Sequence, residues 1–137
     1  MSALSELNYL AILVTAVVIF VIGALWYTVL FGKAWLAAHA YTPEQIEGMK
    51  QGMGRTYGLS FLCYLVLAGV MDLLIVLLGI TAATGGAKLG AVCWLGFVAT
   101  IGLTANLYSN KRLATYLIDA AYQLVFMVVA GVILAIW

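Results

Sequence analysis

The chain has 137 residues, of which 66% are hydrophobic and only 8% are charged, and its formal net charge is +1. Because a soluble domain carries about 25% charged residues, this composition predicts an integral membrane protein whose main partner is the lipid bilayer. The small net charge excludes a nucleic-acid partner of the usual basic kind. Two cysteines and one histidine offer no zinc-binding spacing, so we expect neither a metal nor a cofactor.

Four long apolar runs follow one another, at about residues 8–32, 56–80, 89–108 and 113–137. Each reaches the ~20 residues that a helix needs to cross a hydrocarbon core of ~30 Å. Strands of a membrane barrel would instead alternate over about 10 residues. Ala38-His39-Ala40 resembles a signal-peptide cleavage site, but no basic residue precedes the long first run. The sequence therefore predicts a single all-α domain, a four-transmembrane-helix bundle.

Basic residues indicate the orientation of the four helices. The second loop and both tails contain only Lys88, whereas the first and third loops contain Lys33, Lys50, Arg55, Lys111 and Arg112. Basic loops stay on the cytoplasmic side. We therefore predict that both termini lie outside.

The first run ends in the stretch GALWYTVLFGKAW, residues 23–35. Trp26, Tyr27 and Trp35 bracket Lys33, as aromatic residues do where a helix leaves the bilayer. The lysine stem can lie along the helix while its ammonium reaches water. The stretch is either an interfacial anchor of this kind or part of a functional site.

A short helix is predicted in the first loop. Thr42 and Gln45 form a capping box, and Pro43 takes the first helical position. Apolar residues at 46, 49, 53 and 57 make one face. We expect a short amphipathic cytoplasmic helix against the inner leaflet, weakened and bent by the glycines at 48, 52 and 54.

Two acids lie inside the predicted spans, Asp72 and Asp119. An acid at this depth is unfavourable by ~2.5–3.5 kcal/mol and therefore faces protein or water. Asp72 lies ~25 Å from Arg55 along its helix and Asp119 only ~10 Å from Arg112. The two acids should therefore sit in different leaflets, and they cannot form a catalytic pair within one chain.

Asp119 lies in a polar stripe on the cytoplasmic half of the last helix. We predict a hydrogen-bonded cluster around it, which either binds or passes a small polar solute, ion or lipid head group, or simply clamps the helices together. The expected members of the cluster, from three of the helices, are Tyr122, Gln123, Trp26, Tyr27, Thr28, Thr104, Asn106 and Tyr108, with Lys33 at its mouth.

Asp72 has fewer candidate partners. Either it pairs with Lys88 near the outer surface, with Thr81 and Thr84 close by, or it contacts a second subunit. Gly86 and Gly90 form a GxxxG motif, which permits close helix contact and is weak evidence for oligomers. Four helices enclose little space, so a pore or a large site would need several subunits, and we expect a homo-oligomer.

GALWYTVLFGKAW, together with WLGF at 94–97 and LIDAAYQLV at 117–125, resembles the domain-of-unknown-function 1761 family, which consists of small, mostly bacterial, four-helix membrane proteins. The resemblance covers nearly the whole chain. It implies a bacterial cytoplasmic membrane and draws attention to Trp26, Tyr27, Lys33, Trp35, Asp119 and Gln123. The family usually has a proline two residues after the tyrosine, where this chain has Val29, so a proline kink is not implied here. The family name brings no activity with it.

Three classes of function come into question: a binding or conducting protein, an accessory protein and an intramembrane enzyme. The first is an oligomeric membrane protein that binds or conducts a small polar solute, ion or lipid at Asp119; the second is a structural or accessory protein. We do not expect an enzyme, because the sequence has no nucleophile and base pair and no histidine within a span. An enzyme would also need a second titratable group within hydrogen-bond reach of Asp119, and we expect none.

Overall fold

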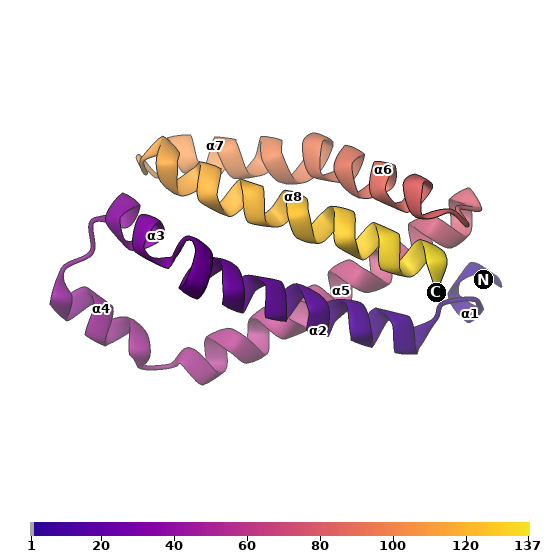
Figure 1. Ribbon diagram of the computed structural model, residues 1–137, viewed down its shortest axis with the longest axis horizontal. Coiled ribbons are helices and arrows are strands. Elements are labelled where there is room, and N and C mark those ends of the chain that lie inside the picture. Colours follow the sequence, from indigo (N-terminus) through magenta and orange to yellow (C-terminus); the bar gives the residue numbers. More distant parts are fainter. Residues whose placement is uncertain (1) are drawn as a thin grey trace.

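A computed structural model describes residues 2–137, and in this part of the chain all regular structure is helical. Four helices are long and apolar enough to cross a membrane: Tyr9–Leu30, Met53–Leu78, Ala83–Tyr108 and Leu113–Ile136. Both termini lie at one end of the molecule, and the segment between the first two spans lies at the other end (Figure 1).

Two of the four spans contain a π-helical turn. The first span is α2 (Tyr9–Leu25) continued by the π-helical segment η1 (Trp26–Leu30), and the second is α5 (Met53–Leu78). The third consists of α6 (Ala83–Cys93), the π-helical segment η2 (Trp94–Ala99) and α7 (Thr100–Tyr108), and the fourth is α8 (Leu113–Ile136). A short helix α1 (Ser2–Ser5) precedes them.

The segment between the first two spans forms two short helices, α3 (Gly32–His39) and α4 (Pro43–Lys50). The predicted capping box at Thr42 and Gln45 is present, with both of its hydrogen bonds. The C-cap of α3 is Ala40, whose φ is +54°. Gly52 has a φ of +74°, a conformation that suits glycine, and it separates α4 from α5.

The third span begins at Ala83 rather than near Leu89, where the apolar run begins. The residues between them include Gly85, Gly86 and Lys88, which favour a loop by composition. Contact with α8 explains why they are helical. A Cβ atom at Gly86 would lie 2.0 Å from the carbonyl oxygen of Gly131, and one at Gly90 would lie 2.2 Å from that of Met127. The GxxxG motif is therefore used inside the chain, against α8, and it is not evidence for an oligomer.

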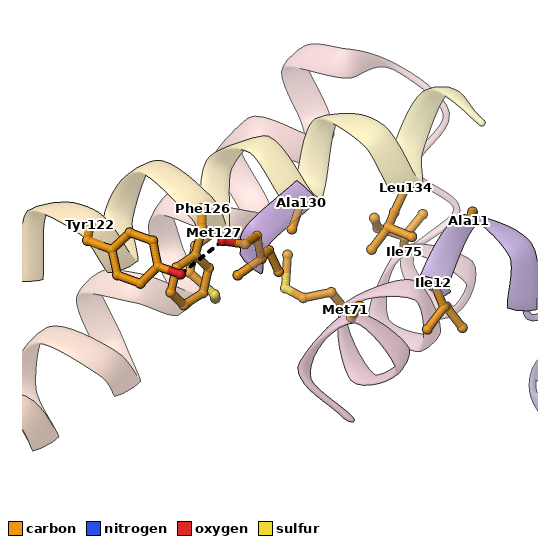
Figure 2. Packing of buried hydrophobic residues seen from close by; sticks show 11 residues of the cluster. Ala11, Ile12, Met71, Ile75, Tyr122, Phe126, Met127, Ala130 and Leu134 are labelled. Atoms are coloured by element: carbon orange, nitrogen blue, oxygen red, sulfur yellow. Dashed lines mark hydrogen bonds between the residues drawn. The ribbon is translucent and has the colours of Figure 1, made fainter. Parts of the chain in front are cut away.

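α8 is the central helix of the fold. It contacts α2, α5 and, most extensively, α6, whereas the third span makes its main contacts with α8 alone. The hydrophobic core accordingly lies where α2, α5 and α8 meet, and Figure 2 shows residues of all three helices in it. Its labelled members are Ala11, Ile12, Met71, Ile75, Tyr122, Phe126, Met127, Ala130 and Leu134.

Candidate functional site

Asp119 lies in the second turn of α8 and accepts a hydrogen bond from Tyr27, at the end of the first span. The distance from the Tyr27 hydroxyl to Oδ1 of Asp119 is 2.5 Å. The Asp119 side chain is half-buried, and within residues 2–137 its other oxygen, Oδ2, accepts no hydrogen bond. One oxygen of the carboxylate is thus held by the protein, and the other is left for a donor or a cation.

Tyr27 is itself a titratable residue. The expectation that no second titratable group would lie within hydrogen-bond reach of Asp119 is therefore wrong. The pairing of Tyr27 with Asp119 follows from depth. Tyr27 lies near the end of the first span and Asp119 near the start of the fourth, and these two helix ends lie on the same side of the bundle (Figure 1). A phenol that donates to a carboxylate holds the carboxylate in one orientation.

Two tryptophans fix the stretch of α8 on either side of Asp119. The indole N–H of Trp26 donates to the carbonyl oxygen of Ile118 at 3.2 Å, and that of Trp94 donates to Ala120 at 2.9 Å. Trp26 comes from the first span and Trp94 from the third. Since a carbonyl oxygen has two lone pairs, it can accept these bonds while remaining in the helix. The backbone on either side of Asp119 is thus hydrogen-bonded to two other spans.

Each of these tryptophans is the first residue of a π-helical segment, Trp26 in η1 and Trp94 in η2. A π-turn inserts one residue into a helix, re-aims the side chains that follow it, and is frequent at functional sites. In η1 the amide of Phe31 donates to the carbonyl of Trp26 at 2.8 Å, which closes the wide turn. Gly32 follows, and a Cβ there would lie 2.8 Å from the Tyr27 carbonyl oxygen. The chain thus changes direction before α3 without the proline that is usual in the family.

Trp94 was not predicted to belong to the site, because WLGF alone carries little information. Its position held a usable signal. Trp94 lies near the middle of the third span, away from the interface where tryptophan is common. A buried indole N–H usually has a partner, and at that depth the partner must be protein.

Tyr122 does not reach Asp119, in contrast to the prediction. Its hydroxyl donates to the carbonyl oxygen of Ile19 at 3.0 Å and lies 3.3 Å from the hydroxyl of Tyr64 (Figure 2 shows the first bond). Gly23 makes this approach to α2 feasible, since a Cβ there would lie 2.7 Å from the Tyr122 hydroxyl. Tyr122 still packs edge-on against Tyr27, with ring centroids 5.3 Å apart, and so it supports the site from one side.

The other predicted members of the cluster do not bond to Asp119. Asn106 is buried and donates to the carbonyl of Lys111 at 3.2 Å, so it closes the end of its own helix. Thr28 and Thr104 donate to backbone carbonyls one turn earlier in their own helices, and Tyr108 is exposed. The structure places Gln123 half-buried one turn after Asp119, and Lys33 exposed in α3. The cluster is therefore smaller than predicted, with Tyr27 as the only side-chain donor to Asp119 among the described residues.

Asp72 is buried, and its partner within residues 2–137 is not Lys88. Its Oδ2 accepts from the backbone amide of Asn8 at 2.9 Å, while Oδ1 of Asn8 caps α2 by accepting from Ala11. The carboxylate therefore sits at the positive N-terminal end of the α2 dipole. Because Asn8 and Tyr27 lie at opposite ends of the first span, the two acids are far apart, as predicted.

Neither cysteine is in a disulfide; Cys63 is exposed and Cys93 is partly covered. No three His, Cys, Asp or Glu side chains of residues 2–137 are close enough together to hold a metal ion. His39 packs between Trp35 and Tyr41, and its Nδ1 lies 2.9 Å from the Trp35 carbonyl oxygen.

The four long apolar helices define a multi-pass membrane protein. Within the spans, Asp119 is hydrogen-bonded through one carboxylate oxygen, and two indole N–H groups donate to backbone carbonyls of α8. Residues 10–135 match the family described as "Protein of unknown function (DUF1761)", which is nearly the whole chain. The chain belongs to this family. No curated protein and no solved structure matches it.

Proposed function

We propose that this chain binds a small cationic or hydrogen-bond-donating group at Asp119, such as a monovalent cation, an ammonium group or the amine of a lipid head group. The observation that carries the proposal is the carboxylate of Asp119, which is bonded at one oxygen and free at the other within residues 2–137. Such an acid in a membrane span is unfavourable unless it is fully paired. A ligand that donates to the second oxygen would complete it.

The surroundings of Asp119 support a binding site. Trp26 and Trp94 hold the backbone on both sides of it, and Tyr27 orients the carboxylate. A site whose groups are held in place before the ligand arrives loses less entropy on binding. We therefore favour a binding role over a catalytic one. Conduction of the ligand across the membrane would be a further step of the same proposal.

A structural or accessory role is the second candidate. Its supporting observation is that Trp26, Trp94, Tyr116 and Tyr122 all donate to backbone carbonyls of other helices. Such interhelical bonds stabilise membrane bundles by about 0.6 kcal/mol each. Under this reading the Tyr27–Asp119 bond is one more clamp.

Thermal unfolding of purified Asp119→Asn against wild type in detergent, from about pH 5 to pH 9, separates the two roles. Asparagine keeps the shape and removes the charge. Under the binding role the variant melts at the same temperature as wild type or higher, because functional charges are kept at a cost to stability. If Asp119→Asn melts well below wild type, the structural role, in which Asp119 holds the helices together, is favoured.

A second arm of the experiment tests binding directly. Sodium, potassium, ammonium and ethanolamine are added in turn to wild type, Asp119→Asn and Tyr27→Phe. A binder raises the melting temperature of wild type with at least one of these probes and does not raise that of Asp119→Asn. If no probe distinguishes the two proteins, binding of these cations at Asp119 is excluded.

We further propose that the chain lies in a bacterial cytoplasmic membrane with both termini outside, α3 and α4 in the cytoplasm, and several copies assembled. The excess of basic residues near α3, α4 and the loop before α8 supports this orientation. A reporter enzyme active only outside the membrane, fused after Trp137, should be active. Activity of a fusion placed in the α3–α4 connection instead would reverse the orientation.

A further inference from the structure

The strongest feature outside the Asp119 site is an apolar groove between α5 and the third span. Its lining runs from Leu62 to Leu74 along α5, with Phe97 on the opposite wall and Met127 of α8 also contributing. The groove lies beside α8, because the third span makes its main contacts with α8 rather than with α5. Its volume is about 580 Å³.

The groove is long and apolar. Leu62 and Leu74 are separated by ~18 Å along the helix axis, so the groove is long, and the residues that line it are apolar. A long apolar groove of this kind suits one extended hydrocarbon chain.

A positive charge lies in line with the groove. Arg55 precedes Leu62 by two helical turns, and the spacing 55, 59, 62, 66 places it on the same face of α5 as Leu62 and Val66. Arg55 is exposed, and it forms no ion pair within residues 2–137. At ~10 Å from the groove's nearer end, its guanidinium is placed for the phosphate of a lipid whose chain enters the groove.

We propose that this groove binds one acyl chain of an anionic phospholipid, with the head group at Arg55. The inference does not depend on the proposal for Asp119, which concerns the opposite charge and other residues. Cys63 and Cys93, the only cysteines of the chain, both line the groove. Their thiols therefore report whether it is occupied.

Native mass spectrometry of the full chain tests the proposal, with phosphatidylglycerol or phosphatidylcholine of identical chains added to the detergent. Wild type should retain phosphatidylglycerol in preference to phosphatidylcholine. Arg55→Gln should weaken that retention about fivefold, the contribution of one basic residue beside anionic lipid. Val66→Trp should lose the lipid because the indole fills the groove. Leu77→Trp is the matched control, since Leu77 is an exposed residue of α5 outside the groove, and it should bind as wild type does.

Alkylation of the native thiols by N-ethylmaleimide gives a readout that needs no tryptophan variant. Phosphatidylglycerol should slow the reaction of Cys93 more than phosphatidylcholine does, and Arg55→Gln should remove the difference. Equal protection by the two lipids would overturn the role of Arg55, and no protection by either would overturn the groove. If Val66→Trp dissociates a dimer while lipid retention is unchanged, the occupant is a second copy and the proposal is wrong.

Discussion

Gly86 of α6 and Gly131 of α8 face each other so closely that a Cβ on either would lie 2.0 Å from the carbonyl oxygen of the other. The contact is reciprocal and runs through two backbones, which cannot give way as the end of a flexible side chain can. It fixes the third span against the central helix. The position of Trp94 beside Ala120 depends on this packing, because η2 continues α6 directly.

Gly86→Ala should therefore lower stability strongly, by more than the ~1–3 kcal/mol of ordinary overpacking. Gly69→Ala is the control, because no atom lies within 4 Å of the Cβ it would add; it should be neutral or slightly stabilising. Thermal unfolding of the two variants in one detergent measures both effects. Equal melting temperatures for the two variants would show that α6 and α8 do not approach as described.

Gly23 and Tyr122 predict a coupled pair of substitutions. Gly23→Ala should destabilise, since the added methyl group meets the Tyr122 hydroxyl and displaces it from the Ile19 carbonyl. Tyr122→Phe alone should lower stability by roughly 0.6 kcal/mol through loss of that bond. In the Tyr122→Phe background the alanine should be better tolerated, because the clashing oxygen is gone. A double-mutant cycle of unfolding free energies measures the coupling, and strict additivity would contradict the contact.

Much of the fold was predictable from elementary constraints. Four apolar runs of bilayer length can only be spanning helices, and the capping box at Thr42 has a local signature that does not depend on the tertiary structure. The Tyr27–Asp119 pair was predictable as well, since depth along two spans is set by counting residues from their ends. These features share one property, which is that they follow from position along a single helix.

The features that the sequence did not predict depend on which helices meet. Gly86 indicates a close approach but does not say against what, and the early start at Ala83 depends on Gly131 nearly fifty residues away. The partner of Asp72 is a backbone amide, at Asn8, and every non-proline residue carries one. The π-turn that begins at Trp94 shifts later side chains around the third span without any change in composition, which is why Asn106 was assigned to the wrong partner.

The two indole bonds to α8 predict a second series. Trp26→Phe and Trp94→Phe keep an aromatic ring and remove only the N–H donor, so each should lower stability by about 0.6 kcal/mol and at most ~1.7 kcal/mol. Trp137→Phe is the control, because Trp137 is exposed at the end of α8. The melting temperatures of the three variants in detergent measure the contribution of each indole bond. A Trp94→Phe protein as stable as Trp137→Phe would mean that the bond to Ala120 contributes nothing.

Asp72 predicts a local effect at the start of α2. Asp72→Leu removes the acceptor of the Asn8 amide, and the first turn of α2 should open more readily because its capped end is no longer held to α5. Hydrogen exchange should therefore accelerate at residues 8–11 and stay unchanged around Tyr27, at the far end of the span. Asp72→Asn retains an acceptor oxygen and should exchange more slowly than Asp72→Leu. If the two variants exchange alike, the charge of Asp72 at the helix terminus, and not the hydrogen bond, holds this end of α2 in place.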